Sequence, residues 1–316
     1  MTFEPRSLVY ALKENVRRVI VGKDEAIELA LIALLCRGHV LIEDVPGVGK
    51  TTLAAALSRS LDCSFRRIQF TPDVTPSDVT GFTMYNAQNG EMEYRPGAAM
   101  TQVLLADEIN RTSPKTQSSL LEVMEEGQVT VDGVTRRLPQ PFLVLATQNP
   151  IDFVGTYPLP EAQMDRFFLR IMIGYPSIEE EMDVLDRYSQ AESPMKALQP
   201  VCGTREILEL QELVGTVYCS REVRSYVATI AAATRNHPSL QLGVSPRGAI
   251  ALVRAAQACA VLAGRAYILP DDVRRMALHV LSHRLILTPE ARMKGISAEA
   301  VLSRLIETLP VPGAKG

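Results

Sequence analysis

The sequence predicts an α/β fold: a three-layer αβα domain with a parallel sheet, followed by a small all-helical domain. Residues 1–174 alternate short apolar runs, which are typical of buried strands, with amphipathic segments of helical period. Residues 175–316 show helical patterns only, separated by prolines and glycines. This change of pattern places the domain boundary after residue 174.

Two helices are expected ahead of the first strand. Residues 7–19 carry apolar side chains at three- and four-residue spacing, and residues 25–36 form a second helical run that ends at Arg37-Gly38. A short apolar turn that contains Val21-Gly22 connects the two helices.

The most informative stretch is residues 40–52, where an apolar run leads into a glycine-rich turn and then a helix. That context suits a phosphate-binding loop, because glycines let successive backbone N–H groups converge on one anion and the helix start adds positive charge. Lys50 supplies a cation for the β- and γ-phosphates, and Thr51 supplies a hydroxyl for Mg²⁺. The generic pattern G-x-x-x-x-G-K-[ST] has glycine where this chain has Asp44. The loop residues predicted to bind a nucleotide are Pro46, Gly47, Val48, Gly49, Lys50, Thr51 and Thr52.

A carboxylate pair follows the next strongly apolar run. Residues 102–106 resemble a buried strand, and Asp107-Glu108 come directly after it. Ligands bind at the carboxyl ends of the strands in open α/β sheets. We therefore expect Asp107 to support Mg²⁺ and Glu108 to polarise an attacking water. The alternative is that Asp107-Glu108 have no function and only form a solvent-exposed strand end. The phosphate loop some sixty residues upstream disfavours this alternative.

Three more strands complete the expected sheet, at residues 65–70, 142–147 and 168–173, with a helix at 115–126. Asn149 follows the second of these strands and could position a water beside the carboxylates. Arg166 lies in a short helix just before the last strand. On its own, this residue could equally be a surface arginine.

Two hairpins are predicted outside the sheet. Residues 81–97 contain a polar turn between two strand-like pieces, with a disordered loop as the alternative. In residues 127–138, Asp132-Gly133 separates two alternating runs, which is a strong hairpin signal. The second hairpin could cover a sheet edge or serve as a contact element in an assembly.

The second domain contains one residue that asks for a functional explanation. Ser245-Pro246 starts a helix and puts Arg247 in its first turn, where a cation opposes the helix dipole. Residues 290–295 read as a loop. The predicted helices are 178–190, 204–214, 220–236, 246–264, 270–284 and 298–309.

Composition excludes several classes of protein. The 33 basic and 36 acidic residues give a formal net charge of −3, which weighs against a nucleic-acid-binding face. Five well-separated cysteines indicate neither a zinc site nor a disulfide framework. No signal peptide or membrane-spanning run is seen, so we expect a soluble cytoplasmic protein.

Taken together, these motifs resemble the MoxR family of AAA+ ATPases over nearly the whole chain. Asp44, unusual for the generic loop, is ordinary in that resemblance. The matching motifs, in the family's order and spacing, are Val21-Gly22, Glu43-Asp-Val-Pro-Gly-Val-Gly-Lys-Thr51, Gln69-Phe-Thr-Pro-Asp73, Leu105-Ala-Asp-Glu-Ile-Asn-Arg111, Ala146-Thr-Gln-Asn-Pro150, Gly155-Thr-Tyr-Pro-Leu-Pro-Glu-Ala162, Met164-Asp-Arg-Phe167 and Ser245-Pro-Arg247.

The resemblance implies an AAA+ domain with a helical lid that binds and hydrolyses ATP with Mg²⁺. It assigns the metal to Thr51 and Asp107, the water-activating base to Glu108 and a γ-phosphate sensor to Asn149. It makes Arg247 a second sensor reaching from the lid, and it places Val21-Gly22 against the adenine. Arg166 becomes the arginine finger given to a neighbouring subunit, and Arg111 is a second candidate for that interface.

The resemblance also implies partners. Family members form hexameric rings and act as chaperone-like partners of proteins with von Willebrand factor A domains. Residues 81–97 correspond to the helix-2 insert and 128–140 to the pre-sensor hairpin. Two other functions are alternatives. A DNA-dependent AAA+ motor would need a basic hairpin, and here only Arg136-Arg137 supply positive charge. A scaffold that binds a nucleotide without hydrolysing it would not need Asp107, Glu108 and Asn149.

Overall fold

A five-stranded parallel sheet forms the centre of the first domain, as predicted. The computed structural model describes residues 4–149, 155–189 and 194–312. Pro150, residue 190 of the predicted 178–190 helix and the tail from 313 lie outside the described residues. In the order of the sheet, the strands are β2 (Phe65–Gln69), β5 (Val103–Asp107), β8 (Leu143–Gln148), β1 (Val40–Glu43) and β9 (Leu169–Ile171).

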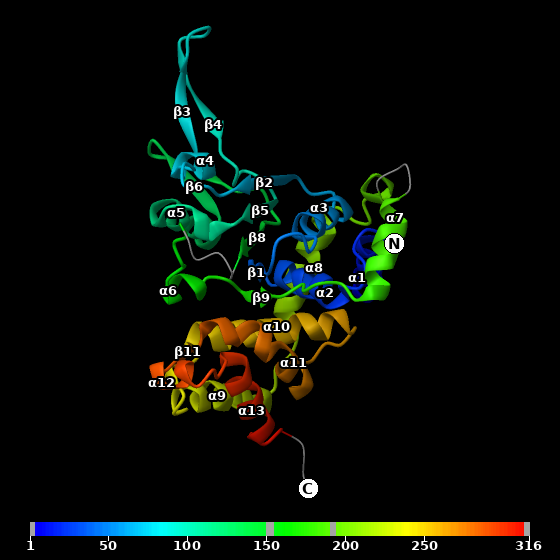
Figure 1. The fold of residues 1–316 in the computed structure, drawn as a ribbon. Coiled ribbons are helices and arrows are strands. Elements are labelled where there is room, and N and C mark those ends of the chain that lie inside the picture. Colours follow the sequence, from blue (N-terminus) through cyan, green and yellow to red (C-terminus); the bar gives the residue numbers. More distant parts are fainter. Residues whose placement is uncertain (1–3, 150–154, 190–193, 313–316) are drawn as a thin grey trace.

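Helices cover both faces of this sheet (Figure 1). Alternate strand residues feed two cores: Val40 and Ile42 pack with α1 (Pro5–Arg17), α2 (Asp24–Leu35) and α3 (Lys50–Ser60). Leu41 packs on the other side with α5 (Pro114–Glu126). This alternation is the reason that the strands read as continuous apolar runs. The three-layer prediction is confirmed.

Both predicted hairpins are present. After α4 (Pro76–Thr80), strands β3 (Gly81–Asn86) and β4 (Glu91–Pro96) pair over their full length and project from the domain (Figure 1). Strands β6 (Gln128–Val131) and β7 (Val134–Arg137) form the other hairpin. The guanidinium of Arg136 lies 4.0 Å from the ring centroid of Tyr94 and so links the two.

The second half of the chain is mainly helical, with two corrections. Strands β10 (Leu240–Leu242) and β11 (Ile286–Leu287) form a small antiparallel sheet, so this region is not all-helical. A short helix, α12 (Pro289–Met293), begins one residue before the predicted 290–295 loop and takes up its first part. Elements of two to five residues are too short for a periodic pattern to reveal. The longer helices are α7 (Ile178–Tyr188), α8 (Thr204–Thr216), α9 (Arg221–Arg235), α10 (Pro246–Leu262), α11 (Pro270–Leu281) and α13 (Ala298–Thr308).

The first of these helices pack on the sheet domain. The Gln211 amide on α8 donates to the Leu34 carbonyl at 2.7 Å, and the Val201 N–H donates to the Ser60 carbonyl at 2.8 Å. The boundary after residue 174 therefore stays a prediction. No helix within the described ranges is long and apolar enough to cross a bilayer.

Arg284 anchors the lid helices to the sheet domain. Its buried guanidinium donates to the Asp165 carboxylate at 2.7 Å and to the Phe167 carbonyl at 2.6 Å. Arg284 lies in a 3₁₀ turn, η3 (Ser282–Arg284), that follows α11, and Asp165 follows the short helix α6 (Glu161–Met164). Phe167 is just ahead of β9, so these bonds fix the lid at the amino edge of the sheet.

Candidate nucleotide-binding site

The glycine-rich loop between β1 and α3 has the backbone that an anion cradle needs. Gly47 and Gly49 have φ of 88° and 91°, in the left-handed region where other residues are strained. A Cβ added at either glycine would meet nothing within 4 Å, so the space in front of the loop is open. The start of α3 at Lys50 has no side-chain cap, which leaves its first N–H groups for a ligand.

Asp44 accounts for the departure from the generic loop pattern. One carboxylate oxygen accepts the N–H groups of Ile173 and Gly174, each at 2.6 Å, and the other accepts the Val45 N–H at 2.8 Å. The buried side chain thus ties the start of the loop to the chain just after β9. Ile173 and Gly174 lie about 130 residues away in the sequence, so no local pattern could reveal them.

Lys50 is held at the loop in a partly buried position. Its ammonium donates to the backbone carbonyl of Asp44 at 2.6 Å. Burial lowers its pKa, while the nearby charges of Asp44, Asp107 and Glu108 act in the opposite direction. A phosphate would join these anions in favouring the ammonium form.

The carboxylate of Asp107 is positioned by two residues that sequence reasoning missed. The Thr147 hydroxyl donates to one oxygen at 2.6 Å, and the Arg67 guanidinium donates to the other at 2.7 Å. Thr147 also accepts the N–H of Glu108 at 2.8 Å, which locks the two strand ends together. The available signal was the polar threonine at the end of the apolar 142–147 run.

Glu108 occupies a strained backbone position. Its φ of 57° is unusual for a residue with a side chain and points to a local functional demand. One carboxylate oxygen accepts the Gln69 amide at 2.8 Å and lies 3.2 Å from Arg111 Nε. The backbone carbonyl of buried Asn149 accepts from the Asn110 amide at 3.4 Å.

One cavity of about 370 Å³ gathers most of the predicted site residues. It opens at the carboxyl ends of β1, β5 and β8, where the topology predicts a ligand site. Val48 instead packs against the core. The lining residues are Pro46, Gly47, Gly49, Lys50, Thr51, Thr52, Arg67, Gln69, Asp107, Glu108 and Asn149.

Val21-Gly22 does not line this cavity. The Glu180 side chain of α7 lies over Gly22, where a Cβ would be only 1.8 Å from a carboxylate oxygen. Lys23, next in the chain, pairs with that carboxylate at 3.5 Å and donates to the Tyr175 carbonyl at 2.9 Å. In this structure the Glu180 side chain of α7 therefore contacts the predicted adenine-facing turn, although Gly22 itself stays exposed.

Arg166 and Arg247 lie together in a different cavity, of about 270 Å³. Both contact the Glu125 carboxylate at the end of α5, at 3.3 Å and 3.1 Å. This cavity is at the amino edge of the sheet, beside His39, and shares no lining residue with the first one. The picture of Arg247 reaching the phosphate loop of its own chain is therefore wrong. The bonds of Arg284 hold the lid at the amino edge of the sheet, whereas the phosphate loop lies at the carboxyl edge.

The residues present fit a nucleoside triphosphate with Mg²⁺. The open glycine cradle and Lys50 suit phosphates, and the Thr51 hydroxyl with the Asp107 carboxylate offers hard oxygen ligands. Within the described part of the chain no cluster of three or more histidines, cysteines, aspartates or glutamates could hold a metal alone. Such a Mg²⁺ would accordingly need phosphate oxygens as further ligands.

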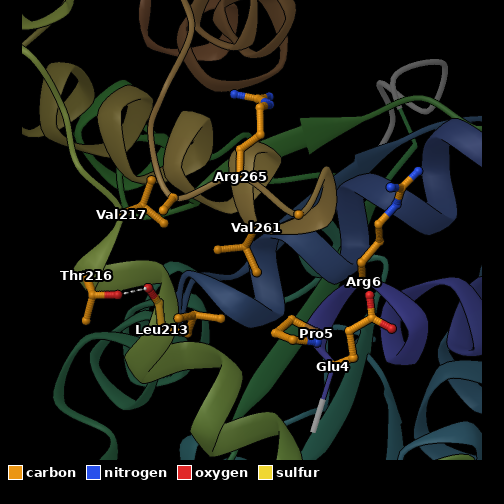
Figure 2. A pocket seen from close by; sticks show the side chains of 10 residues that line it. Glu4, Pro5, Arg6, Leu213, Thr216, Val217, Val261 and Arg265 are labelled. Atoms are coloured by element: carbon orange, nitrogen blue, oxygen red, sulfur yellow. Dashed lines mark hydrogen bonds between the residues drawn. The ribbon is translucent and has the colours of Figure 1, made fainter. Parts of the chain in front are cut away.

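A further pocket, of about 340 Å³, lies between the start of α1 and the ends of α8 and α10 (Figure 2). Pro5, Val217 and Val261 form its apolar wall, with Arg6 and Arg265 at its rim. Arg265 is occupied by a two-pronged pair with Asp272 at 2.7 Å and 2.9 Å. The pocket has neither a glycine cradle nor a carboxylate pair, so it is no second nucleotide site.

The sheet order, the loop cradle and the carboxylate pair at a strand end define the class of phosphate-loop ATPases known as AAA+. The family model described as "ATPase family associated with various cellular activities (AAA)" matches residues 39–169, and a model of the AAA lid domain matches residues 232–305. The segment that matches the lid model includes Arg284.

Comparison with whole chains narrows the class. The chain is 42% identical to "Chaperone MoxR1" of Mycobacterium tuberculosis, covering 94% of this chain and 81% of that protein. It is 54% identical to the uncharacterised protein YeaC of Bacillus subtilis, covering 95% and 93%. A solved structure of a candidate ATPase from Cytophaga hutchinsonii, 38% identical, superposes with a TM-score of 0.92 over 97% of this chain and 96% of that one. This chain belongs to the MoxR family of AAA+ ATPases.

Proposed function

We propose that this chain hydrolyses ATP in the presence of Mg²⁺ and uses the cycle to remodel or activate a partner protein. The observation that carries the proposal is the single cavity that joins Lys50 and Thr51 to Asp107, Glu108 and Asn149. These polar groups come from three places, the start of α3 and the ends of β5 and β8, and one triphosphate could touch all of them. AAA+ family membership supports ATP as the substrate.

In the proposed mechanism, the loop N–H groups and Lys50 bind the β- and γ-phosphates, and Thr51 with Asp107 hold the metal. When bound, Mg²⁺ would neutralise the charge that develops on the phosphoryl oxygens. Glu108 accepts the proton of the attacking water, with Asn149 orienting that water. Because Gln69 and Arg111 contact the Glu108 carboxylate, this base must leave them to reach the water.

We infer that the site is completed by a second copy of the chain. Arg166 and Arg247 share Glu125 at the sheet edge opposite the phosphate loop, so their own nucleotide is out of their reach. A neighbour packed head to tail would receive both arginines at its phosphates. Such packing gives a ring when the rotation between neighbouring copies closes, and we propose a closed ring of six copies. Arg111, beside Glu108, remains the alternative finger.

The partner is proposed to be a protein. The relative from M. tuberculosis is named a chaperone, and the projecting β3–β4 hairpin here exposes Phe82, Met84, Tyr85 and Met92. Exposed apolar side chains of this kind mark contact surfaces. We extend the proposal to partners with a von Willebrand factor A domain. A DNA motor is disfavoured, because of the two hairpin arginines only Arg137 is exposed, while Arg136 is stacked on Tyr94.

Steady-state phosphate release with ATP and Mg²⁺ tests the proposal, with Glu108→Gln as the key variant. The amide cannot take a proton from water, so turnover is expected to fall by about 10² to 10⁴ while ATP binding persists. Removing Mg²⁺ with a chelator should likewise stop release. Rapid turnover by Glu108→Gln would remove this residue from its role, and a wild-type chain that binds ATP without hydrolysing it would favour the scaffold alternative. Turnover that rises on adding duplex DNA would favour the motor.

A further inference from the structure

Helix α7 is attached to its own chain by its polar face. Arg187 donates to the carbonyl of Arg17 at 2.7 Å, at the end of α1. Glu180 pairs with Lys23 and contacts Gly22. No residue of α7 is buried, although helices on a domain surface normally turn an apolar stripe inward.

The apolar stripe of α7 faces outward. Ile178, Met182 and Leu185, spaced as i, i+4 and i+7, are 76%, 60% and 66% exposed. Tyr175, just ahead of the helix, is 72% exposed and extends the stripe toward the phosphate loop. Exposed carboxylates flank it, because the helix has five acidic residues and one arginine. A continuous exposed apolar stripe of this length marks a protein contact.

A surface of opposite charge runs along α10. Arg247, Ile250 and Arg254, at i, i+3 and i+7, are all exposed and line the basic cavity that contains Arg166. Ile250, 58% exposed, is an apolar centre between two arginines. The charge and apolar content of this surface are thus complementary to those of α7.

The two surfaces are placed for head-to-tail contact. Figure 1 shows α7 and α6 on opposite sides of the molecule, and the Ser245 hydroxyl, 3.3 Å from Asp165, ties the start of α10 to the α6 side. On one side Asp44 bonds Ile173 and Gly174, so α7 starts just beyond the phosphate loop. On the other side Ile250 and Arg254 continue along α10 from Arg247. Each stripe runs from residue i to residue i+7, a rise of about 10 Å along the helix, so their lengths match.

We propose that α7 of one copy docks on α10 of the next, with Ile178, Met182 and Leu185 against Ile250 and the flanking carboxylates against Arg254. The inference rests on the proposed function, since the same contact would bring the neighbour's Arg166 and Arg247 to the nucleotide edge. The partner is a second copy of this chain, held by a different patch on each side, as a closed ring requires. Docking would thus cover the apolar stripe of α7 and complete the nucleotide site in the same step.

Sedimentation velocity over a concentration series, with Mg²⁺ and a slowly hydrolysed ATP analogue, tests the apolar half of the contact. Met182→Glu should raise the concentration needed for assembly roughly tenfold or more, as for a central interface residue. The matched control is Met293→Glu, which alters a methionine 82% exposed on α12 and should assemble like wild type. Equal assembly of Met182→Glu and wild type would overturn the inference.

A charge exchange tests the partner surface. Asp186→Arg and Arg254→Glu should each weaken assembly, and the double variant should regain most of the loss because the pair is restored with reversed sign. A double variant no better than the weaker single variant overturns the assigned contact, as does a photo-crosslinker at position 185 that labels a different protein or a region outside 246–262. If wild type assembles and hydrolyses ATP and the α7 variants do the same, only this inference fails. A wild-type chain that stays monomeric and inactive overturns the inference and the proposed function together.

Discussion

At the scale of single residues, the site depends on carboxylates that are themselves held by hydrogen bonds to the protein. Asp44 replaces a glycine of the generic loop, yet it is among the most connected side chains there, with three N–H donors from two segments. Asp107 is fixed from both sides by Thr147 and Arg67. Such hydrogen bonds orient the carboxylates that would contact a substrate or metal and hold them apart from one another.

Restoring the generic residue is therefore expected to harm the protein. Asp44→Gly would leave the N–H groups of Ile173 and Gly174 without their acceptor, at a cost of about 1 to 3 kcal/mol in the free energy of unfolding. Asp44→Asn, which keeps one oxygen, should lose less. Urea unfolding of the three chains measures this order. A glycine variant as stable as wild type would mean that solvent or a local shift satisfies those N–H groups.

Arg166 gives the sharpest test of a shared site. Arg166→Ala should keep ATP affinity and lose roughly 10³ to 10⁵ in turnover, since a finger acts only on the transition state. Arg205→Ala, which removes an arginine 87% exposed on α8, is the control and should stay at the wild-type rate. Mixing Arg166→Ala with an excess of Glu108→Gln should restore some activity, because a Glu108→Gln chain still donates its arginine and an Arg166→Ala chain still has its base. If mixing restores nothing, the finger does not act between copies.

At the scale of elements, a buried cation is among the contacts that place the lid on the sheet domain. Arg284 reaches from η3 to the Asp165 carboxylate and the Phe167 carbonyl, and it keeps α10 at the amino edge of the sheet. The beginnings and ends of helices and strands followed from periodicity and from caps such as Ser245. This lid placement did not, because Arg284 lies more than 110 residues from both partners and resembles any arginine at a helix end.

Arg284→Ala should consequently cost about 3 to 5 kcal/mol in the free energy of unfolding, because it removes the cation paired with the Asp165 carboxylate and the donor to the Phe167 and Phe168 carbonyls. The comparison is Arg304→Ala, an exposed arginine of α13. Thermal and urea unfolding of both variants give the difference. A loss for Arg284→Ala no larger than that of the control would show that apolar packing alone holds the lid.

The sequence predicted the sheet, both hairpins and most of the residues that line the cavity at the phosphate loop, because each of these has a local pattern with a physical cause. It missed Arg67, Thr147 and Gln69, which act through strand neighbours. It also misplaced Arg247, since the motif Ser245-Pro-Arg247 records a helix start and not the edge of the sheet to which that helix is attached.

At the scale of the whole molecule, stability should depend on pH through a buried histidine. Burial lowers the pKa of His39 to about 4, and its neutral ring accepts the Val144 N–H while the other nitrogen lies 2.9 Å from the Met124 carbonyl. The unfolded chain binds this proton near pH 6.5, so the unfolded state gains protons first as pH falls. Stability should drop between about pH 6.5 and pH 4, by up to about 3 kcal/mol from this residue.

Urea unfolding at a series of pH values measures this slope. His39→Gln keeps a donor and an acceptor but cannot titrate, so its stability should change less over the same pH range. Burial and the adjacent Arg284 also lower the pKa of His283, which adds a slope of the same sign that persists in the variant. Identical slopes for wild type and His39→Gln would remove His39 as a cause.

Glu125 provides a route by which nucleotide binding in one copy could change the position of the hairpins in its neighbour. Its carboxylate has two arginines as partners, and one residue later α5 ends before the turn at Gly127 that opens the β6–β7 hairpin. If a neighbour's phosphates draw Arg166 and Arg247 away, Glu125 loses both counterions at the base of that hairpin. Because Arg136 of the same hairpin is stacked on Tyr94, any resulting tilt passes to β3–β4 as well. The hairpins of one copy would then report the nucleotide held by the next.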